Sequence, residues 1–338
     1  MVPALAVADA LRAEGAAVTF IGGARAEAQL VPQAGYQFRA ISVEGLSRSS
    51  PVHAARALLR AARATLRARA LLAELRPDAV MGGGGYAAGP VGVAALTRRI
   101  PLVLSEADSH LGLTNRMLAR FARRVCLAFP ITGREGARYR LTGRPIPAVQ
   151  VERTDARERL GIAADETCVL VFGGSLGART LNQAALSAFA STAFHVLHVC
   201  GRRDYPELSG QPLPAGYDLR EYLDIDEFTA ALAASDLVVA RAGGSLFEIA
   251  AHGLPAILVP YPHASADHQS ANARWMSEAG AAIVVQDAEL SPSRLAREVA
   301  QLLANPARLS TMASASRRLA RPNAAREIAA ELLEAAGQ

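Results

Sequence analysis

The amino-acid sequence predicts an α/β fold built from two Rossmann-like, doubly wound parallel-sheet domains. Helical and strand-like segments alternate along the 338 residues. The predicted strands contain continuous apolar runs, at 169–172 and at 256–259, which is typical of parallel strands covered by helices on both faces. A chain of this length, with 51% apolar residues, is also long enough for two domains.

The first half begins with a helix over 3–14, which Gly15 ends, followed by a strand over 17–21. The elements that follow are a helix over 54–75, a strand over 78–81, a helix over 90–97, a strand over 101–104 and a helix over 112–124. A doubly wound domain normally opens with a strand and a glycine-rich turn. We therefore expect the first domain to be incomplete at its N-terminus.

The pattern starts again after a Pro- and Arg-containing stretch at 143–159. The elements of the second half are a strand over 167–172, a helix over 179–189, a strand over 194–199, a helix over 227–234, a strand over 236–240, a helix over 245–252 and a strand over 256–259. We therefore expect domains over 1–148 and 149–338.

The composition excludes several classes of protein. The three cysteines are widely spaced, with no CxxC pair and no nearby histidines at metal-ligand spacing, so neither a disulfide scaffold nor a structural zinc site is expected. The sequence predicts no transmembrane segment and no signal peptide. Residues 1–150 hold 20 arginines and 9 acidic residues, whereas 151–338 hold 16 and 22. This asymmetry suggests that the first half faces an anionic partner.

Two glycine turns in the second half follow apolar strands and lead into helices. The turn at 173–179 presents backbone N–H groups, a helix N-terminus and the Ser175 hydroxyl, which favours a phosphate site over a merely tight turn. The turn at 241–248 places Glu248 where a carboxylate binds ribose hydroxyls or, alternatively, only complements the helix dipole. A polar cluster at 263–272 follows the next strand, with a solvated loop as the alternative.

The first half has a similar arrangement. The glycines at 82–85 follow one predicted strand, and four in succession suggest close approach of a ligand. Glu106, Asp108, His110 and Asn115 follow the next strand. Each alone is more often a cap or loop residue, but their grouping at the carboxyl ends of two strands favours a site.

Arginines form a stripe at positions 56, 60, 63 and 67 of the predicted helix 54–75, and the helix 112–124 adds four more beside apolar residues. Such a surface suits an anionic membrane surface, or it is a solvated basic face. Nucleic acid is not expected as a partner, because the sequence contains no aromatic stacking platform and no known nucleic-acid-binding motif.

Taken together and in this order, the motifs resemble the MurG family of glycosyltransferase family 28, the UDP-N-acetylglucosamine transferases that add the second sugar to the lipid-linked peptidoglycan precursor. The resemblance runs over essentially the whole chain. It is carried by Val2–Val7, Gly83–Pro90, Gly112–Asn115, Gly173–Arg179, Arg241–Glu248, Asp267–Gln269 and Asn272.

The resemblance implies a GT-B architecture with a cleft between two Rossmann-like domains, the first binding the undecaprenyl-linked acceptor and the second the UDP-sugar. The implied reaction is inverting transfer of N-acetylglucosamine to the muramoyl-pentapeptide, lipid I to lipid II, by a peripheral protein at the cytoplasmic face of the cell membrane. UDP-N-acetylglucosamine is then a substrate, and no tightly bound cofactor and no metal site are expected. The implied donor-binding residues are Gly174, Ser175, Gly177, Arg179, Arg241, Gly243, Gly244, Ser245, Glu248, His268 and Gln269, and the implied acceptor-side residues are Gly84, Tyr86, Asp108 and Asn115.

The chain also departs from the family pattern. The family's first glycine-rich loop and its histidine are expected ahead of residue 1, and Ser105 stands where the family commonly has histidine. Glu106 and Asp108 are therefore the candidate catalytic residues within the chain. The alternatives are a related GT-B transferase with another acceptor, a UDP-sugar epimerase, and a non-catalytic binding protein that lacks the first glycine loop.

Overall fold

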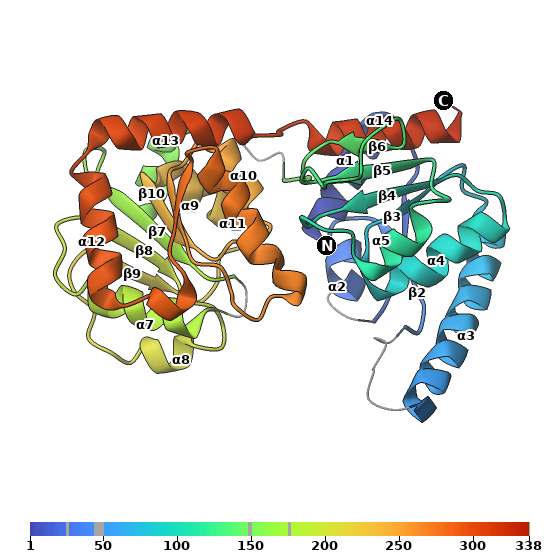
Figure 1. Ribbon diagram of the computed structural model, residues 1–338, viewed down its shortest axis with the longest axis horizontal. Helices are drawn as coiled ribbons and strands as arrows, with labels where there is room; N and C mark the ends of the chain where they lie inside the picture. Colours follow the sequence, from blue (N-terminus) through green and yellow to red (C-terminus); the bar gives the residue numbers. More distant parts are fainter. Residues whose placement is uncertain (25–26, 44–50, 148–150, 175–176, 338) are drawn as a thin grey trace. The chain divides into compact units, whose positions relative to one another are not determined.

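The computed structural model describes residues 1–24, 27–43, 51–147, 151–174 and 177–337, with side chains in helix α3 from residue 59 onward (Figure 1). The chain divides into two compact units, one formed by 1–147 with 321–338 and the other by 148–320. The predicted boundary at residue 148 lies at this division. The prediction differs for the last helix, because α14 (Ala324–Ala336) packs in the first unit and not in the second.

The second unit contains a six-stranded, fully parallel sheet in the order β12–β11–β10–β7–β8–β9. Its strands are β7 (Cys168–Phe172), β8 (His195–Val199), β9 (Tyr217–Arg220), β10 (Leu237–Ala240), β11 (Ala256–Leu258) and β12 (Ala282–Val284). Its helices are α6 (Arg153–Leu160), α7 (Arg179–Ala188), α8 (Tyr205–Leu208), α9 (Ile225–Ala234), α10 (Leu246–Ala251), α11 (His268–Glu278), α12 (Pro292–Leu303) and α13 (Pro306–Leu319), with short 3₁₀ turns η1 (Ser265–Asp267) and η2 (Asp287–Glu289).

The position of β7 within the sheet explains why its sequence is apolar throughout rather than alternating between apolar and polar residues. Leu170 and Phe172 enter the core that α9, α10 and α11 cover, whereas Val169 and Val171 enter the core that α7 and α12 cover. Because both faces of the strand are buried under helices, every position must be apolar. The doubly wound arrangement predicted for the second domain is confirmed.

The first unit contains two parallel sheets in the described residues. The larger has the order β3–β4–β5–β6, with β3 (Val80–Gly82), β4 (Leu102–Glu106), β5 (Arg124–Leu127) and β6 (Tyr139–Leu141), and the smaller pairs β1 (Thr19–Gly22) with β2 (Gln37–Ala40). The helices are α1 (Val2–Ala13), α2 (Glu27–Gln33), α3 (Pro51–Leu75), α4 (Gly85–Thr97), α5 (Leu113–Leu118) and α14. The predicted single sheet is therefore divided, since the described β1 bonds only to β2 and β3 only to β4.

Helices cover both faces of the larger sheet. Helices α3 and α4 pack on one face, where Leu72 and Ala95 meet Leu104, and Val7 of α1 with Ile328 of α14 packs on the other. The predicted helix over 112–124 is too long. It ends at Leu118, because Arg123 donates its N–H to Leu102 O and β5 begins beside β4.

Candidate functional site

The carboxyl edge of the second unit's sheet brings the two predicted glycine turns together. Strands β7 and β10 are neighbours (Figure 1), and the chain continues from β7 to β8 on one side and from β10 to β11 on the other. Open α/β sheets bind ligands at the point where the strand order reverses in this way. The turn at 173–178 follows β7 and the turn at 241–245 follows β10, so both lie at this point.

Gly177 shows why the turn after β7 needs glycine. Its φ angle is +83°, and a Cβ atom there would lie 2.1 Å from the carbonyl oxygen of Cys200. The turn therefore packs backbone against backbone. Gly174 also has a positive φ, whereas Ser175 lies outside the described residues and its predicted phosphate contact stays a prediction.

Asn182 anchors helix α7 beneath this turn. Its buried Nδ2 donates hydrogen bonds of 2.8 Å to the carbonyl of Cys200 and to the carboxylate of Asp204. Hydrogen bonds from Arg203 and Asn182 lower the pKa of Asp204, although burial opposes them. Arg179, a predicted donor residue, begins α7 with an exposed side chain whose Nε lies 3.6 Å from the Asp204 carboxylate.

A buried histidine completes the support of Asn182. His198 Nε2 lies 3.0 Å from Asn182 Oδ1, and its Nδ1 lies 2.7 Å from the Tyr217 hydroxyl. Because the Asn182 oxygen accepts, His198 carries its proton on Nε2 and accepts from Tyr217. Burial lowers the pKa of His198 to about 4. The ring is therefore neutral near pH 7, and the network is a fixed support for the turn.

Arg241 is the buried cation of the site. It is 6% exposed, and its Nη1 donates to the carbonyls of Val259 (3.1 Å) and Pro260 (3.2 Å). The same Nη1 lies 2.6 Å from the Asp287 carboxylate, and Nη2 donates to the Thr180 hydroxyl at 2.7 Å. Its buried Nε has no hydrogen-bond partner in the part of the chain that the structure describes.

The other predicted donor residues lie on the same edge. Gly243, Gly244 and Ser245 form the half-exposed turn before α10, and Glu248 is half-buried in that helix. His268 and Gln269 begin α11, and Gln269 Oε1 accepts a hydrogen bond of 2.9 Å from the backbone of Tyr261. Asn272, buried in α11, donates to the carbonyl of Ala242 and so holds the turn after β10.

Glu106 ends β4 in the first unit and organises its own loop. The buried carboxylate accepts hydrogen bonds from the backbone of Asp108 (3.2 Å), the backbone of Gly112 (2.9 Å) and Asn115 Nδ2 (2.9 Å). Both of its oxygens are therefore occupied. The carboxylate of Asp108 is half-buried and accepts no hydrogen bond within the described ranges.

The remaining acceptor-side residues lie at the carboxyl ends of β3 and β4. Gly84, with φ +77°, precedes α4, and Tyr86 follows in its first turn with an exposed side chain. Asn115 is buried in α5 and donates to the carbonyl of Ser105. The structure thus brings Gly84 and Asn115 together, since a Cβ at Gly84 would lie 3.7 Å from Asn115 Nδ2.

The predicted basic face is exposed on α3 and on the segment containing α5. Arg63 and Arg67 are exposed beside Leu66, which is 67% exposed. Met117 and Phe121 are 63% and 55% exposed, and Arg120 lies over the ring of Phe121. The side chain of Arg56 lies outside the described residues.

Sequence reasoning missed Asp287, Asp204 and the buried His198. Asp287 belongs to no glycine motif, and its only signal is its position after an apolar segment, Ala282–Val284, that the sequence analysis did not assign as a strand. The described residues contain no group of three or more His, Cys, Asp or Glu placed to hold a metal ion. No helix in those ranges is long and apolar enough to cross a membrane.

The chain is similar to known glycosyltransferases over almost all of its length. The model of the glycosyltransferase family 28 N-terminal domain matches residues 1–127, and that of the C-terminal domain matches residues 168–331. A protein of Rubrobacter xylanophilus is 42% identical over 97% of this chain and 98% of its own length. A protein of Halothermothrix orenii is 37% identical over 95% and 91%, respectively. Both are named UDP-N-acetylglucosamine–N-acetylmuramyl-(pentapeptide) pyrophosphoryl-undecaprenol N-acetylglucosamine transferase.

Solved structures show the same similarity. The crystal structure of Acinetobacter baumannii MurG matches with a TM-score of 0.79 and 30% identity, over 98% of this chain and 95% of that one. A putative UDP-N-acetylglucosamine 2-epimerase from Listeria monocytogenes matches with a TM-score of 0.69 at 17% identity, over 97% and 92%, which reflects a shared fold alone.

Proposed function

The chain belongs to glycosyltransferase family 28, and we propose that it transfers N-acetylglucosamine from UDP-N-acetylglucosamine to the lipid-linked muramoyl-pentapeptide of peptidoglycan synthesis. One structural observation carries the proposal. The glycine turns of the second unit meet where the sheet order reverses, and a buried arginine lies between them. This arrangement suits a sugar nucleotide.

The second unit supplies the donor site in this proposal. The backbone of the turn after β7 and the N-terminus of α7 face the diphosphate, whose negative charge the helix dipole favours. The carboxylate of Glu248 binds the ribose hydroxyls. His268 and Gln269 lie nearest the sugar. Arg241 supplies positive charge beside the nucleotide as the leaving group departs.

The first unit binds the acceptor and supplies the base. The base takes the proton of the acceptor hydroxyl, the hydroxyl oxygen bonds to the anomeric carbon, and the bond from that carbon to the diphosphate breaks. UDP leaves, and the sugar configuration inverts without a covalent intermediate. Of the two candidates, Asp108 suits this role better than Glu106, because both Glu106 oxygens are held by its own loop.

The basic face of the first unit is the proposed contact with the anionic, cytoplasmic face of the membrane. Exposed Leu66, Met117 and Phe121 insert among the lipids, and Arg63 and Arg67 meet the lipid phosphates. Replacing both arginines with Gln should weaken the free energy of binding to vesicles containing phosphatidylglycerol by about 1 kcal/mol for each arginine. Cosedimentation measures this change. If the variant and the wild-type protein bind the vesicles equally at low salt, these arginines do not contribute to the membrane contact.

The transfer reaction itself is tested with labelled UDP-N-acetylglucosamine and a lipid I analogue. The expected product is the labelled disaccharide lipid together with one UDP for each sugar transferred. Conversion of the donor to its 2-epimer, or donor binding without transfer, would contradict the proposal. The proposal includes no tightly bound cofactor, and parallel assays with Mg²⁺ and with EDTA measure any contribution of a divalent cation.

A further inference from the structure

Asp287 lies in the turn after β12 and contacts the start of α7 and the first residue of the turn after β10. Its Oδ1 is 2.6 Å from Arg241 Nη1 and accepts a hydrogen bond of 2.8 Å from the Thr180 hydroxyl. That hydroxyl in turn accepts a hydrogen bond of 2.7 Å from Arg241 Nη2. The three side chains therefore form a closed triangle, in which each contacts the other two.

The triangle joins segments that are far apart in the chain. Thr180 is the second residue of α7, immediately beyond the turn at 173–178, and Arg241 is the first residue after β10. Asp287 begins η2, and Arg241 also holds the carbonyls of Val259 and Pro260 after β11. One guanidinium thus ties the carboxyl ends of β7, β10, β11 and β12, which are neighbours in the sheet.

The charge of Asp287 is what makes this arrangement stable. A buried guanidinium is costly unless a carboxylate compensates it. Within the described ranges, Asp287 is the single acidic side chain within ion-pair distance of Arg241. Without the carboxylate, Arg241 would be drawn toward water, and the start of α7 and the turn after β10 would lose their common anchor.

We propose that Asp287 is a positioning residue for the sugar-nucleotide donor. It fixes the guanidinium of Arg241 and the start of α7, so that the N-terminus of α7 and the turn after β10 are held at the spacing that the diphosphate requires. Asp287 acts through Arg241 and Thr180 and needs no contact of its own with the donor. This inference rests on the proposed function, because it assumes that the donor binds at these turns.

The test compares three single variants and one double variant with the wild-type protein. Asp287→Ala should raise the dissociation constant and the KM for UDP-N-acetylglucosamine by about tenfold, the effect of one lost hydrogen bond between the displaced Arg241 and the charged diphosphate, and should leave the KM for the lipid acceptor unchanged. Asp287→Asn keeps an oxygen acceptor and should recover part of the donor affinity. Thr180→Val should weaken donor binding less than Asp287→Ala, and the double variant should bind no more weakly than Asp287→Ala alone.

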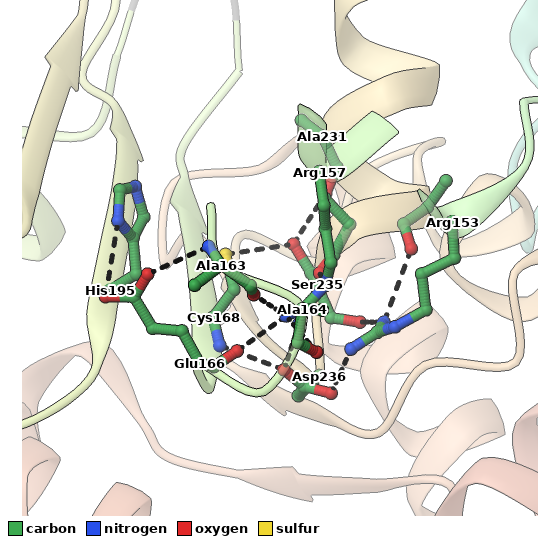
Figure 2. Close-up of polar contacts among 12 residues, drawn as sticks. Arg153, Arg157, Ala163, Ala164, Glu166, Cys168, His195, Ala231, Ser235 and Asp236 are labelled. Carbon is green, nitrogen blue, oxygen red and sulfur yellow. Dashed lines mark hydrogen bonds and ion pairs between the residues drawn. The ribbon is translucent and has the colours of Figure 1, made fainter. Parts of the chain in front are cut away.

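Asp236→Asn is the matched control. Asp236 also compensates a buried arginine, Arg157, in the same unit, but at the amino edge of the sheet (Figure 2). This control should lower the melting temperature without changing donor affinity. If Asp287→Ala behaves like Asp236→Asn, with lower stability and unchanged donor KM, Asp287 is a stabilising residue only and the proposal is overturned.

Hydrogen exchange separates this proposal from the proposed function. In the absence of any donor, Asp287→Ala should exchange faster than wild type at residues 177–182 and 241–246, and Asp236→Asn should not. If wild-type protein fails to bind UDP-N-acetylglucosamine, the proposed function fails, but the exchange result still tests the triangle. Equal exchange in Asp287→Ala and wild type overturns the anchor.

Discussion

Two buried arginines of the second unit each pair with an aspartate, but they differ in how completely their nitrogens are hydrogen-bonded. Arg157 of α6 is 4% exposed, pairs with Asp236 and donates from all three nitrogens, four of its bonds going to backbone carbonyls (Figure 2). Arg241 is 6% exposed and pairs with Asp287, yet its Nε has no partner among the described residues. Buried donors are rarely left unsatisfied in a folded protein.

The two arginines differ in their hydrogen bonding because they lie at opposite edges of the same sheet. Arg157 lies at the amino edge, where Asp236 precedes β10 and bonds to the backbone of Cys168 at the start of β7. Arg241 lies at the carboxyl edge, where parallel sheets bind ligands. A completely satisfied cluster stabilises the fold, whereas an arginine at the ligand edge can also supply charge to a bound anion. The following substitutions test this distinction.

Arg157→Met should have the largest effect on stability. The substitution removes the buried partner of Asp236, which keeps only its more exposed ion pair with Arg153, and leaves the carbonyl oxygens of Ala164, Glu166 and Ala234 without a donor, so the free energy of unfolding should fall by about 3–5 kcal/mol. Urea unfolding measures this loss. Donor affinity, measured calorimetrically on the folded variant, should not change, and a large loss of affinity would break the distinction between the edges.

Arg241→Met should have the opposite balance of effects, with a large loss of donor affinity and a smaller loss of stability. Donor affinity should fall by about 2–4 kcal/mol, because a charged donor group is removed beside the diphosphate. The loss of stability should be smaller than for Arg157→Met, since the substitution leaves two carbonyl oxygens without a donor rather than three. Titration calorimetry with UDP-N-acetylglucosamine and urea unfolding on one preparation give both numbers. Unchanged affinity would make Arg241 another structural arginine.

Glu248→Ala should weaken donor affinity by about 1–3 kcal/mol, the range for a lost hydrogen bond to a charged group. A comparison of the affinities for UDP and for deoxy-UDP tests directly whether Glu248 contacts the ribose hydroxyls. The variant should bind the two alike, whereas wild type should prefer the ribonucleotide. If Glu248→Ala retains that preference, Glu248 does not bind ribose and only complements the helix dipole.

The support beneath the turn after β7 should be sensitive to acid. Burial lowers the pKa of His198 to about 4, whereas an unfolded histidine has a pKa near 6.5. Between these values the unfolded chain binds a proton that the folded chain does not, so the free energy of unfolding should fall with decreasing pH, by about 1 kcal/mol for each pH unit. Above pH 6.5 this contribution is constant. His198→Gln should flatten the slope in urea melts at pH 4.5–7.5, and an unchanged slope would assign it to other groups.

The sequence predicts most of the fold because its local signals agree with the tertiary structure. The strand predicted at 167–172 is β7 at Cys168–Phe172, and the helix predicted at 179–189 is α7 at Arg179–Ala188. The helix predicted at 112–124 fails after Leu118, where pairing with β4 overrides a helical apolar pattern. Helix α14 joins the first unit through contacts that no local pattern encodes.

Some residues of the candidate site can likewise be predicted from local sequence, and others cannot. Glycine turns and the residues that follow apolar strands, such as Arg241 and Glu248, can be found from local sequence because their position depends on one strand. Asp287 cannot, because its role depends on β12 lying two strands away from β10 in the sheet. Glu106 has the right residue type for a base, and only the structure shows that its own loop occupies both oxygens.

The most direct test of the account maps where UDP-N-acetylglucosamine protects backbone amides from hydrogen exchange in the wild-type protein. We predict protection at residues 177–182, 241–248 and 259–263, which form the carboxyl edge around Arg241, and none at 153–166 or 233–236 around Arg157. Protection confined to the amino edge, or equal at both edges, would contradict the account.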